Sequence, residues 1–236
     1  MHGHSSSPPA TFAGGAPGAD RVPPQRVGLR RSLCGAALLA AASGTAFAYT
    51  ATLTPAAPQT VYLQVGVGSF TANYNAGGQP QNNTTINVVS TTLAAAALGN
   101  STAQAMTTNS SAANSFLDGY LFCNVPGQLY IGGFYRTTGA ATAAAQVVAT
   151  VPAALTNATG GTIPFSKVAW TSGGNGPGNA TEPFPAGTFV NGGTQNVGSM
   201  ASNTWNESCW TFSYLNNIVP QAGTFSGRVL YTLSAP

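Results

Sequence analysis

The sequence predicts an all-β fold, a sandwich of antiparallel strands. Short runs of β-branched and aromatic residues recur along the chain, and Gly, Pro or Asn bound most of them; strands joined by tight turns have this pattern. Only 5% of the residues are charged, against roughly 25% in an ordinary soluble domain. This composition excludes a helical bundle, because the exposed faces of its helices are built largely from charged residues.

Residues 1–48 have the pattern of an export signal. Arg30 and Arg31 precede a short apolar run, and Ala46-Phe47-Ala48 supplies the small residues of a cleavage site. The run is too short to span a bilayer. We expect cleavage after Ala48, which would leave residues 49–236 as one exported domain. The arginine pair leaves both Sec and twin-arginine export open, and a short buried helix is the alternative interpretation.

The first three expected strands are residues 60–67, 85–90 and 128–136. The first is a β-branched and aromatic run between a proline and a glycine, and the second follows a turn region rich in Gly, Gln and Asn. The third begins directly after a Pro-Gly pair, which is a strong turn signal. Residues 94–98 and 111–116 are expected to form short helical turns between these strands.

Four more strands are expected at residues 146–151, 163–171, 208–215 and 224–234. The first of these is rich in valine and ends before a proline, the second alternates apolar with polar residues, and the third is rich in aromatic residues. Residues 173–178 are expected to form an irregular glycine-rich loop. Seven or more short strands with such turns predict an immunoglobulin-like sandwich.

The exported domain has a balanced charge and contains no histidine, because His2 and His4 both lie in the leader. The absence of histidine excludes Ser–His–Asp and Cys–His catalysis and the common zinc sites. Three dispersed bases cannot neutralise a row of phosphates, which excludes nucleic-acid binding. We therefore expect no enzymatic activity, metal or cofactor, and carboxylates that are solvated or paired at the surface. The charged residues are Asp118, Glu182, Glu207, Arg136, Lys167 and Arg228.

Two cysteines remain in the exported domain, Cys123 and Cys209. An even number of cysteines in an exported chain predicts a disulfide bond, and two cysteines allow one pairing. Closing so long a loop stabilises a fold by roughly 4–5 kcal/mol as an upper estimate. Two buried free thiols are the alternative.

The C-terminal segment has a clear period of two. Phe225, Gly227, Val229, Tyr231 and Leu233 alternate with mostly polar residues, which predicts a strand with one apolar face. Its residues from the glycine at 223 to the tyrosine at 231 resemble the last strand of chaperone–usher pilus subunits, including their spore-coat-U-like relatives. The resemblance implies an incomplete sandwich that lacks one strand. A plain terminal strand of a complete sandwich is the alternative.

The same resemblance implies partners. A periplasmic chaperone would supply the missing strand first. At an outer-membrane usher, the N-terminal extension of the next subunit would then replace that strand. The polymer would consist of copies of the chain. Tyr49, Ala51 and Leu53 alternate with threonines and suit such a donor segment in part, although Pro55 and Pro58 interrupt it.

Two functions follow from these patterns. The first is a structural subunit of an extracellular fibre or surface layer of a bacterium, which reaches the cell surface through the periplasm. A near-zero net charge suits it, because identical subunits then pack without mutual repulsion. The second is a secreted carbohydrate-binding or adhesin module, in which an exposed Trp205 would stack on sugar rings. Neither function calls for a membrane span in the exported domain.

Overall fold

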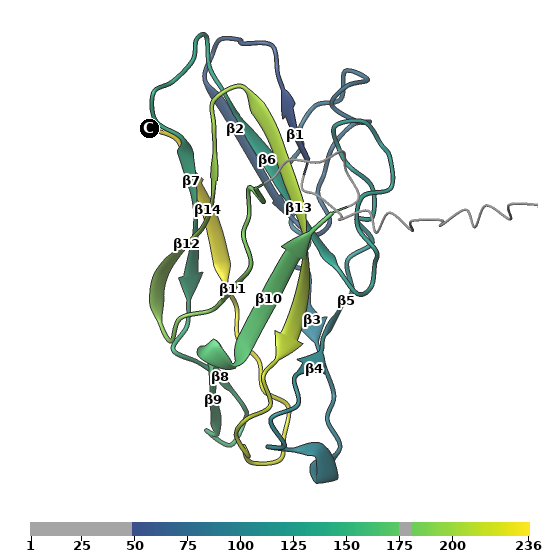
Figure 1. Cartoon of the computed structure of the whole chain (residues 1–236), viewed down its shortest axis with the longest axis vertical. Coiled ribbons are helices and arrows are strands. Elements are labelled where there is room, and N and C mark those ends of the chain that lie inside the picture. Colours follow the sequence, from purple (N-terminus) through teal and green to yellow (C-terminus); the bar gives the residue numbers. More distant parts are fainter. Residues whose placement is uncertain (1–48, 175–180) are drawn as a thin grey trace, which may run out of the picture. The chain divides into compact units, whose positions relative to one another are not determined.

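The computed structural model describes residues 49–174 and 181–236. The predicted leader and cleavage site lie outside these residues, as does most of the predicted loop at 173–178. In the described residues the strands pair antiparallel with one another and the helices are single 3₁₀ turns (Figure 1). The predicted all-β sandwich is confirmed. No helix in this part of the chain is both long and apolar enough to cross a membrane.

The larger sheet is organised around one long strand, β13. Its first half, up to Ser208, pairs with β1 and β6, and its second half pairs with β10 and β4. β2 continues the sheet beyond β6, and β11 continues it beyond β10. The strands of this sheet are β1 (Tyr49–Thr52), β2 (Thr60–Val65), β4 (Gln104–Ala105), β6 (Leu129–Arg136), β10 (Val168–Gly173), β11 (Gly187–Thr188) and β13 (Thr204–Tyr214).

The smaller sheet has β7 in its centre, between β12 and β14. Two further strand pairs, β3 with β5 and β8 with β9, stand outside both sheets. The remaining elements are β3 (Val89–Ser90), β5 (Thr107–Thr108), β7 (Ala145–Val151), β8 (Ala154–Thr156), β9 (Thr162–Pro164), β12 (Gly193–Met200), β14 (Leu230–Ser234) and the 3₁₀ turns η1 (Ala95–Ala97) and η2 (Phe165–Lys167).

The main hydrophobic core lies between the two sheets. Alternate residues of β7 point into it, and from β13 it receives Trp210 and Phe212. The indole rings of Trp170 and Trp210 have centroids 5.2 Å apart at its centre. Both tryptophans are buried, which accounts for their place within strand patterns in the sequence.

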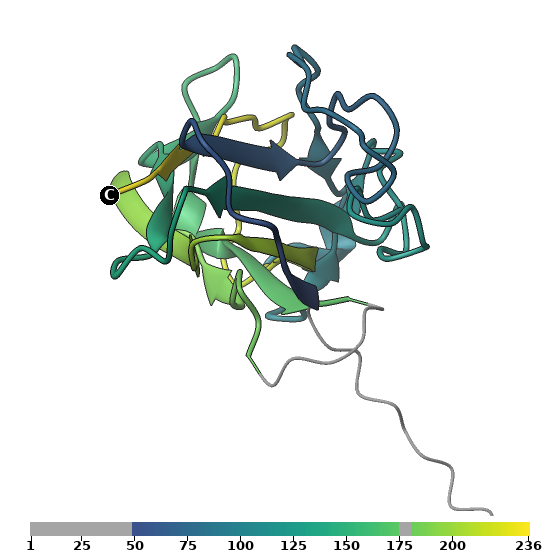
Figure 2. The same cartoon turned by 90° about the horizontal axis from the view of Figure 1, so that it is seen from above.

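The opposite face of the larger sheet is also buried. Two irregular stretches, residues 69–79 and 110–123, cover it, and we call them the covering segments. Figures 1 and 2 place these loops on the side of the larger sheet away from β7 and β14. Phe70, Tyr74, Phe116 and Leu117 from the covering segments pack on Trp205 and Phe134. β13 is therefore buried on both faces, which explains its lack of simple alternation.

A disulfide bond joins Cys123, at the end of the second covering segment, to Cys209 of β13. The two Cα atoms are 5.6 Å apart, the positions are separated by 86 residues, and both side chains are fully buried. The bond predicted from the cysteine count is thus present, and it fastens an irregular layer to the strand around which the larger sheet is built.

Several predicted elements differ from the structure. The strand expected at 208–215 starts earlier, at Thr204, because the covering segments bury the Asn/Ser-rich stretch before it. The strand expected at 163–171 is divided by the turn η2. Residues 85–90 pair only at their end, and no helix forms at 111–116. The C-terminal strand is shorter than expected: it starts at Leu230, after an isolated bridge between Ser226 and Thr156.

We predict that replacing both Cys123 and Cys209 by alanine lowers the free energy of unfolding by roughly 2–5 kcal/mol. The reason is that the covering segments contribute little regular pairing to the larger sheet and depend on this tether. Urea denaturation of the purified domain measures the effect, and the reduced wild-type domain should match the variant. Equal stability of the oxidised, reduced and alanine forms would contradict the prediction.

Candidate functional site

The main core is incompletely covered along one side, between β2 and β14. Five apolar side chains that pack on this core are only partly buried there: Leu63, Val65, Val229, Tyr231 and Leu233. The first two belong to β2 and the other three to β14 and the residue before it. We call these five side chains, together with the two strand edges that carry them, the open rim.

Both strands of the open rim are edge strands. In the described part of the chain β2 pairs only with β6, and β14 pairs only with β7. Some Cα atoms of β2 and β14 lie within 8 Å of each other, yet the two strands do not pair. Two sheets therefore meet here without a ladder that joins them.

The backbone of β2 directs hydrogen-bonding groups toward this open side. The Gly66 N–H donates to the Tyr130 carbonyl of β6 at 2.7 Å. Hydrogen-bonded pairs alternate along an antiparallel ladder, so Val61 and Leu63 point their N–H and C=O groups away from β6. An exposed row of such groups is a template for pairing with another strand.

Asn87 closes one end of this edge. Its side-chain amide donates to the Val65 carbonyl at 3.0 Å and accepts from the Val67 N–H at 3.1 Å. The amide thus takes the place of a peptide group on a neighbouring strand. Gly66 has a φ of 77° and makes room for it, because a Cβ atom at this position would collide with the Asn87 amide. The edge left unoccupied is therefore the stretch from Val61 to Leu63.

The predicted assembly strand contributes to the open rim. Tyr231 and Leu233 of β14 pack on the core, and the Tyr231 ring lies 5.9 Å from that of Trp210. Burial raises the pKa of Tyr231 above its ordinary value of 10.0. Phe225 and Gly227 precede the strand, and a Cβ atom at Gly227 would lie 2.6 Å from the Phe165 ring. The inward side of this segment is apolar over its whole length, although only its second half is a regular strand.

In this structure the segment with the predicted donor residues Tyr49, Ala51 and Leu53 is not a free extension. Tyr49 and Ala51 belong to β1, which pairs with β13 of the same chain. The Leu53 N–H donates to the Asn203 carbonyl at 2.8 Å, and its side chain is buried against the covering segments. The alternation in its sequence matches this edge position in its own sheet, and the role of the segment as a donor stays a prediction.

Trp205 does not serve as an exposed stacking residue. Its side chain has no exposed surface, and its indole N–H donates to the Glu207 carboxylate at 3.0 Å. The polar residues around Trp205 in the sequence suggested a loop, but the covering segments bury this stretch. The observation that favoured a carbohydrate-binding module is thereby removed.

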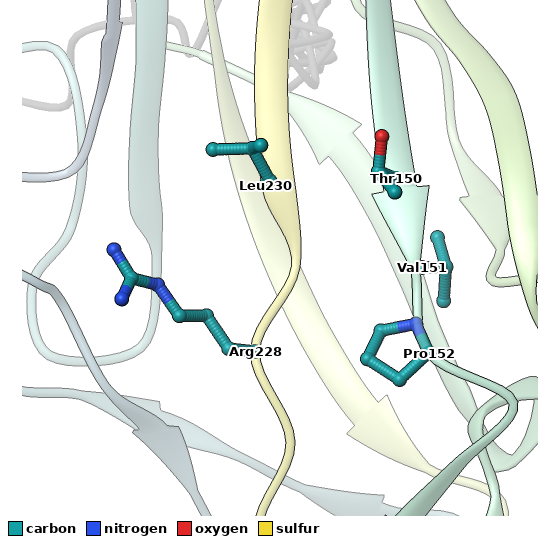
Figure 3. Close-up of a pocket in the computed structure, with 5 residues that line it drawn as sticks. All are labelled: Thr150, Val151, Pro152, Arg228 and Leu230. Atoms are coloured by element: carbon teal, nitrogen blue, oxygen red, sulfur yellow. The ribbon is translucent and has the colours of Figure 1, made fainter.

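A shallow hollow lies at the outer face of the smaller sheet. Thr150, Val151 and Pro152 at the end of β7 border it on one side, and Arg228 and Leu230 border it on the other (Figure 3). The Leu230 side chain is 58% exposed. The hollow offers one cation and one hydroxyl group, which is no recognisable catalytic arrangement.

Comparisons with protein-family models, curated proteins and solved structures find no match for this chain.

We predict that Asn87→Ala lowers the free energy of unfolding by about 1–2 kcal/mol, because the Val65 carbonyl and Val67 N–H lose their partners. Urea denaturation measures the loss. Asn191→Ala is a suitable comparison, because that exposed side chain accepts from the Ser166 N–H at 2.7 Å and water can replace the bond, so the loss should be smaller. Unchanged stability in Asn87→Ala would show that the amide does not close the edge.

Proposed function

We propose that this protein is a structural subunit of an extracellular fibre or surface layer, and that it assembles when the open rim accepts a β-strand from another chain. The observation that carries the proposal is that the free edges of β2 and β14 lie beside five partly exposed core side chains. An added strand would bond to the edges through its backbone and cover the side chains with its own, which is how strand addition combines affinity with specificity.

The spacing of the rim supports an opening step. A strand between two others needs them about 9.5 Å apart, twice the usual spacing between neighbours. Parts of β2 and β14 lie within 8 Å of each other, so these parts would move apart as the strand enters. We propose that the structure is the closed form of the subunit.

The chemistry of the rim favours an uncharged, extended donor. The rim side chains are aliphatic or aromatic, and in this domain the acids and bases are equal in number. A strand with alternating apolar residues fits, and copies of the chain can approach without net repulsion. A periplasmic chaperone would supply such a strand before assembly, and a neighbouring copy would supply it at the usher and in the fibre.

The N-terminal segment of a neighbouring copy remains the donor that the sequence favours. It would first have to leave its place beside β13 in its own chain. That exchange is open to the segment because it is a short edge strand that pairs on one side, and segments with few stabilising contacts open locally at low free-energy cost.

We predict that Val229→Asp abolishes assembly while the isolated domain still folds, because a charged side chain on the rim would be buried without a partner by the incoming strand. Phe225→Ser, on the same side of the segment, should weaken assembly in the same way. Electron microscopy and sedimentation measure assembly, and circular dichroism checks the fold.

Thr232→Asp is the matched control. Thr232 lies in β14 itself, but its side chain is exposed on the outer face of the smaller sheet. The control should assemble as the wild type does. Normal fibres from Val229→Asp, or equal loss in both aspartate variants, would contradict assembly through the open rim.

A further inference from the structure

A carboxyl group lies buried beneath the covering segments. The Glu207 side chain has no exposed surface and extends from the first half of β13. Its Oε2 atom accepts from the Tyr130 hydroxyl at 2.6 Å and from the Trp205 indole N–H at 3.0 Å. Its Oε1 atom has no hydrogen-bond partner among the described residues. The expectation that the carboxylates of this chain are solvated or paired at the surface is therefore wrong for Glu207.

The place of this carboxyl group is built into the larger sheet. Gly132 of β6 lies directly opposite Glu207 in the ladder. A Cβ atom at Gly132 would collide with the Tyr130 hydroxyl group, so the glycine leaves the space through which Tyr130 reaches Glu207. Burial and the adjacent Glu207 raise the pKa of Tyr130 well above its ordinary value of 10.0, which keeps the hydroxyl a donor.

Within the described part of the chain, no base is among the groups that shift the pKa of Glu207. The groups that act on the Glu207 carboxyl group are Tyr130 of β6, Trp205 of β13, and Ser115 and Asp118 of the second covering segment. None of these side chains is a base. From β2, Tyr62 raises the pKa of Tyr130, and its hydroxyl donates to the side-chain oxygen of Gln64. β1 presents the backbone of its ladder partner, Tyr49.

Ionisation of Glu207 would therefore place an unpaired negative charge in an apolar layer and beside another acid. Burial raises the pKa of the Glu207 carboxyl group from its ordinary value of 4.5 to about 7, although hydrogen bonds from Tyr130, Trp205 and Ser115 lower it in part. Asp118 also raises this pKa, and because Asp118 belongs to the covering segment, the repulsion acts between that segment and the sheet.

We propose that Glu207 is a proton-operated latch, which holds the covering segments on the larger sheet when its carboxyl group is protonated and loosens them when it is ionised. Opening would hydrate the carboxylate without breaking the ladders of β13. The covering segments are bonded to one another, as between the Asn75 N–H and the Leu117 carbonyl at 2.6 Å. They would therefore move together, and the Cys123–Cys209 bond would keep them attached.

The direction of the pH dependence follows from linkage. A carboxyl group with a raised pKa stabilises the closed form while it is protonated, and this stabilisation is lost as the pH rises from 4.5 to about 7. Over this window the opening equilibrium of the covering segments should rise by up to about 300-fold, tenfold for each unit of pH in its middle part, and then level off.

Amide hydrogen exchange of the whole oxidised domain tests the latch. The wild type and Glu207→Gln are compared residue by residue at each pH between 4.5 and 8.5, so that base catalysis of exchange cancels in the ratio. In the covering segments the wild-type rate should exceed that of Glu207→Gln by a ratio that grows up to about pH 7. In β6 and β10 the ratio should change much less.

Glu182→Gln is the matched control, because the Glu182 carboxylate accepts from Ser208 of the same strand at 2.9 Å. It should keep the wild-type pH profile. The proposal is overturned if Glu207→Gln also keeps that profile, or if the amides of β6 and β10 change as much as those of the covering segments. The second result would mean that Glu207 affects the stability of the whole domain.

Discussion

Burial of β13 on both faces is the constraint on which the rest of the structure depends. One face of the strand carries Trp210 and Phe212 into the core between the sheets, and the other carries Trp205, Glu207 and Cys209 under the covering segments. Its first half lies between β1 and β6, and its second half pairs with β10 and, at its last two residues, with β4. A strand enclosed in this way must satisfy its polar side chains internally. Glu207 bonds with Tyr130 and Trp205, Asn206 with Thr204, and Ser208 with Glu182.

The two layers on either side of β13 differ in how they are held. The smaller sheet packs by apolar contact, and in residues 49–174 and 181–236 its edge at β14 has no partner strand. The covering segments have little regular structure, and the disulfide bond and an aromatic cluster fasten them. Strand addition is therefore proposed for the edge of the larger sheet at β2, and the Glu207 latch for the face beneath the covering segments.

The sequence predicted the strands whose apolar residues are local and failed where burial comes from distant segments. Runs such as Leu129–Arg136 and Ala145–Val151 are rich in β-branched or aromatic residues and were correctly placed within a residue. Gly193–Met200 has no such run, yet it forms an edge strand because β7 offers it a ladder. Trp205 and Glu207 were misjudged because the segments that bury them are far away in the chain. The rim depends on which strands remain unpaired, a property of topology that alternation in one segment does not reveal.

The central claim is that an added strand occupies the free edge of β2. Amide hydrogen exchange at Val61 and Leu63, compared between the isolated domain and its assembled form, tests it most directly. The account predicts that both amides exchange rapidly in the isolated domain and at least about 100-fold more slowly after assembly, as expected for groups that enter a ladder. Assembled material in which these two amides exchange as fast as in the isolated domain would contradict it.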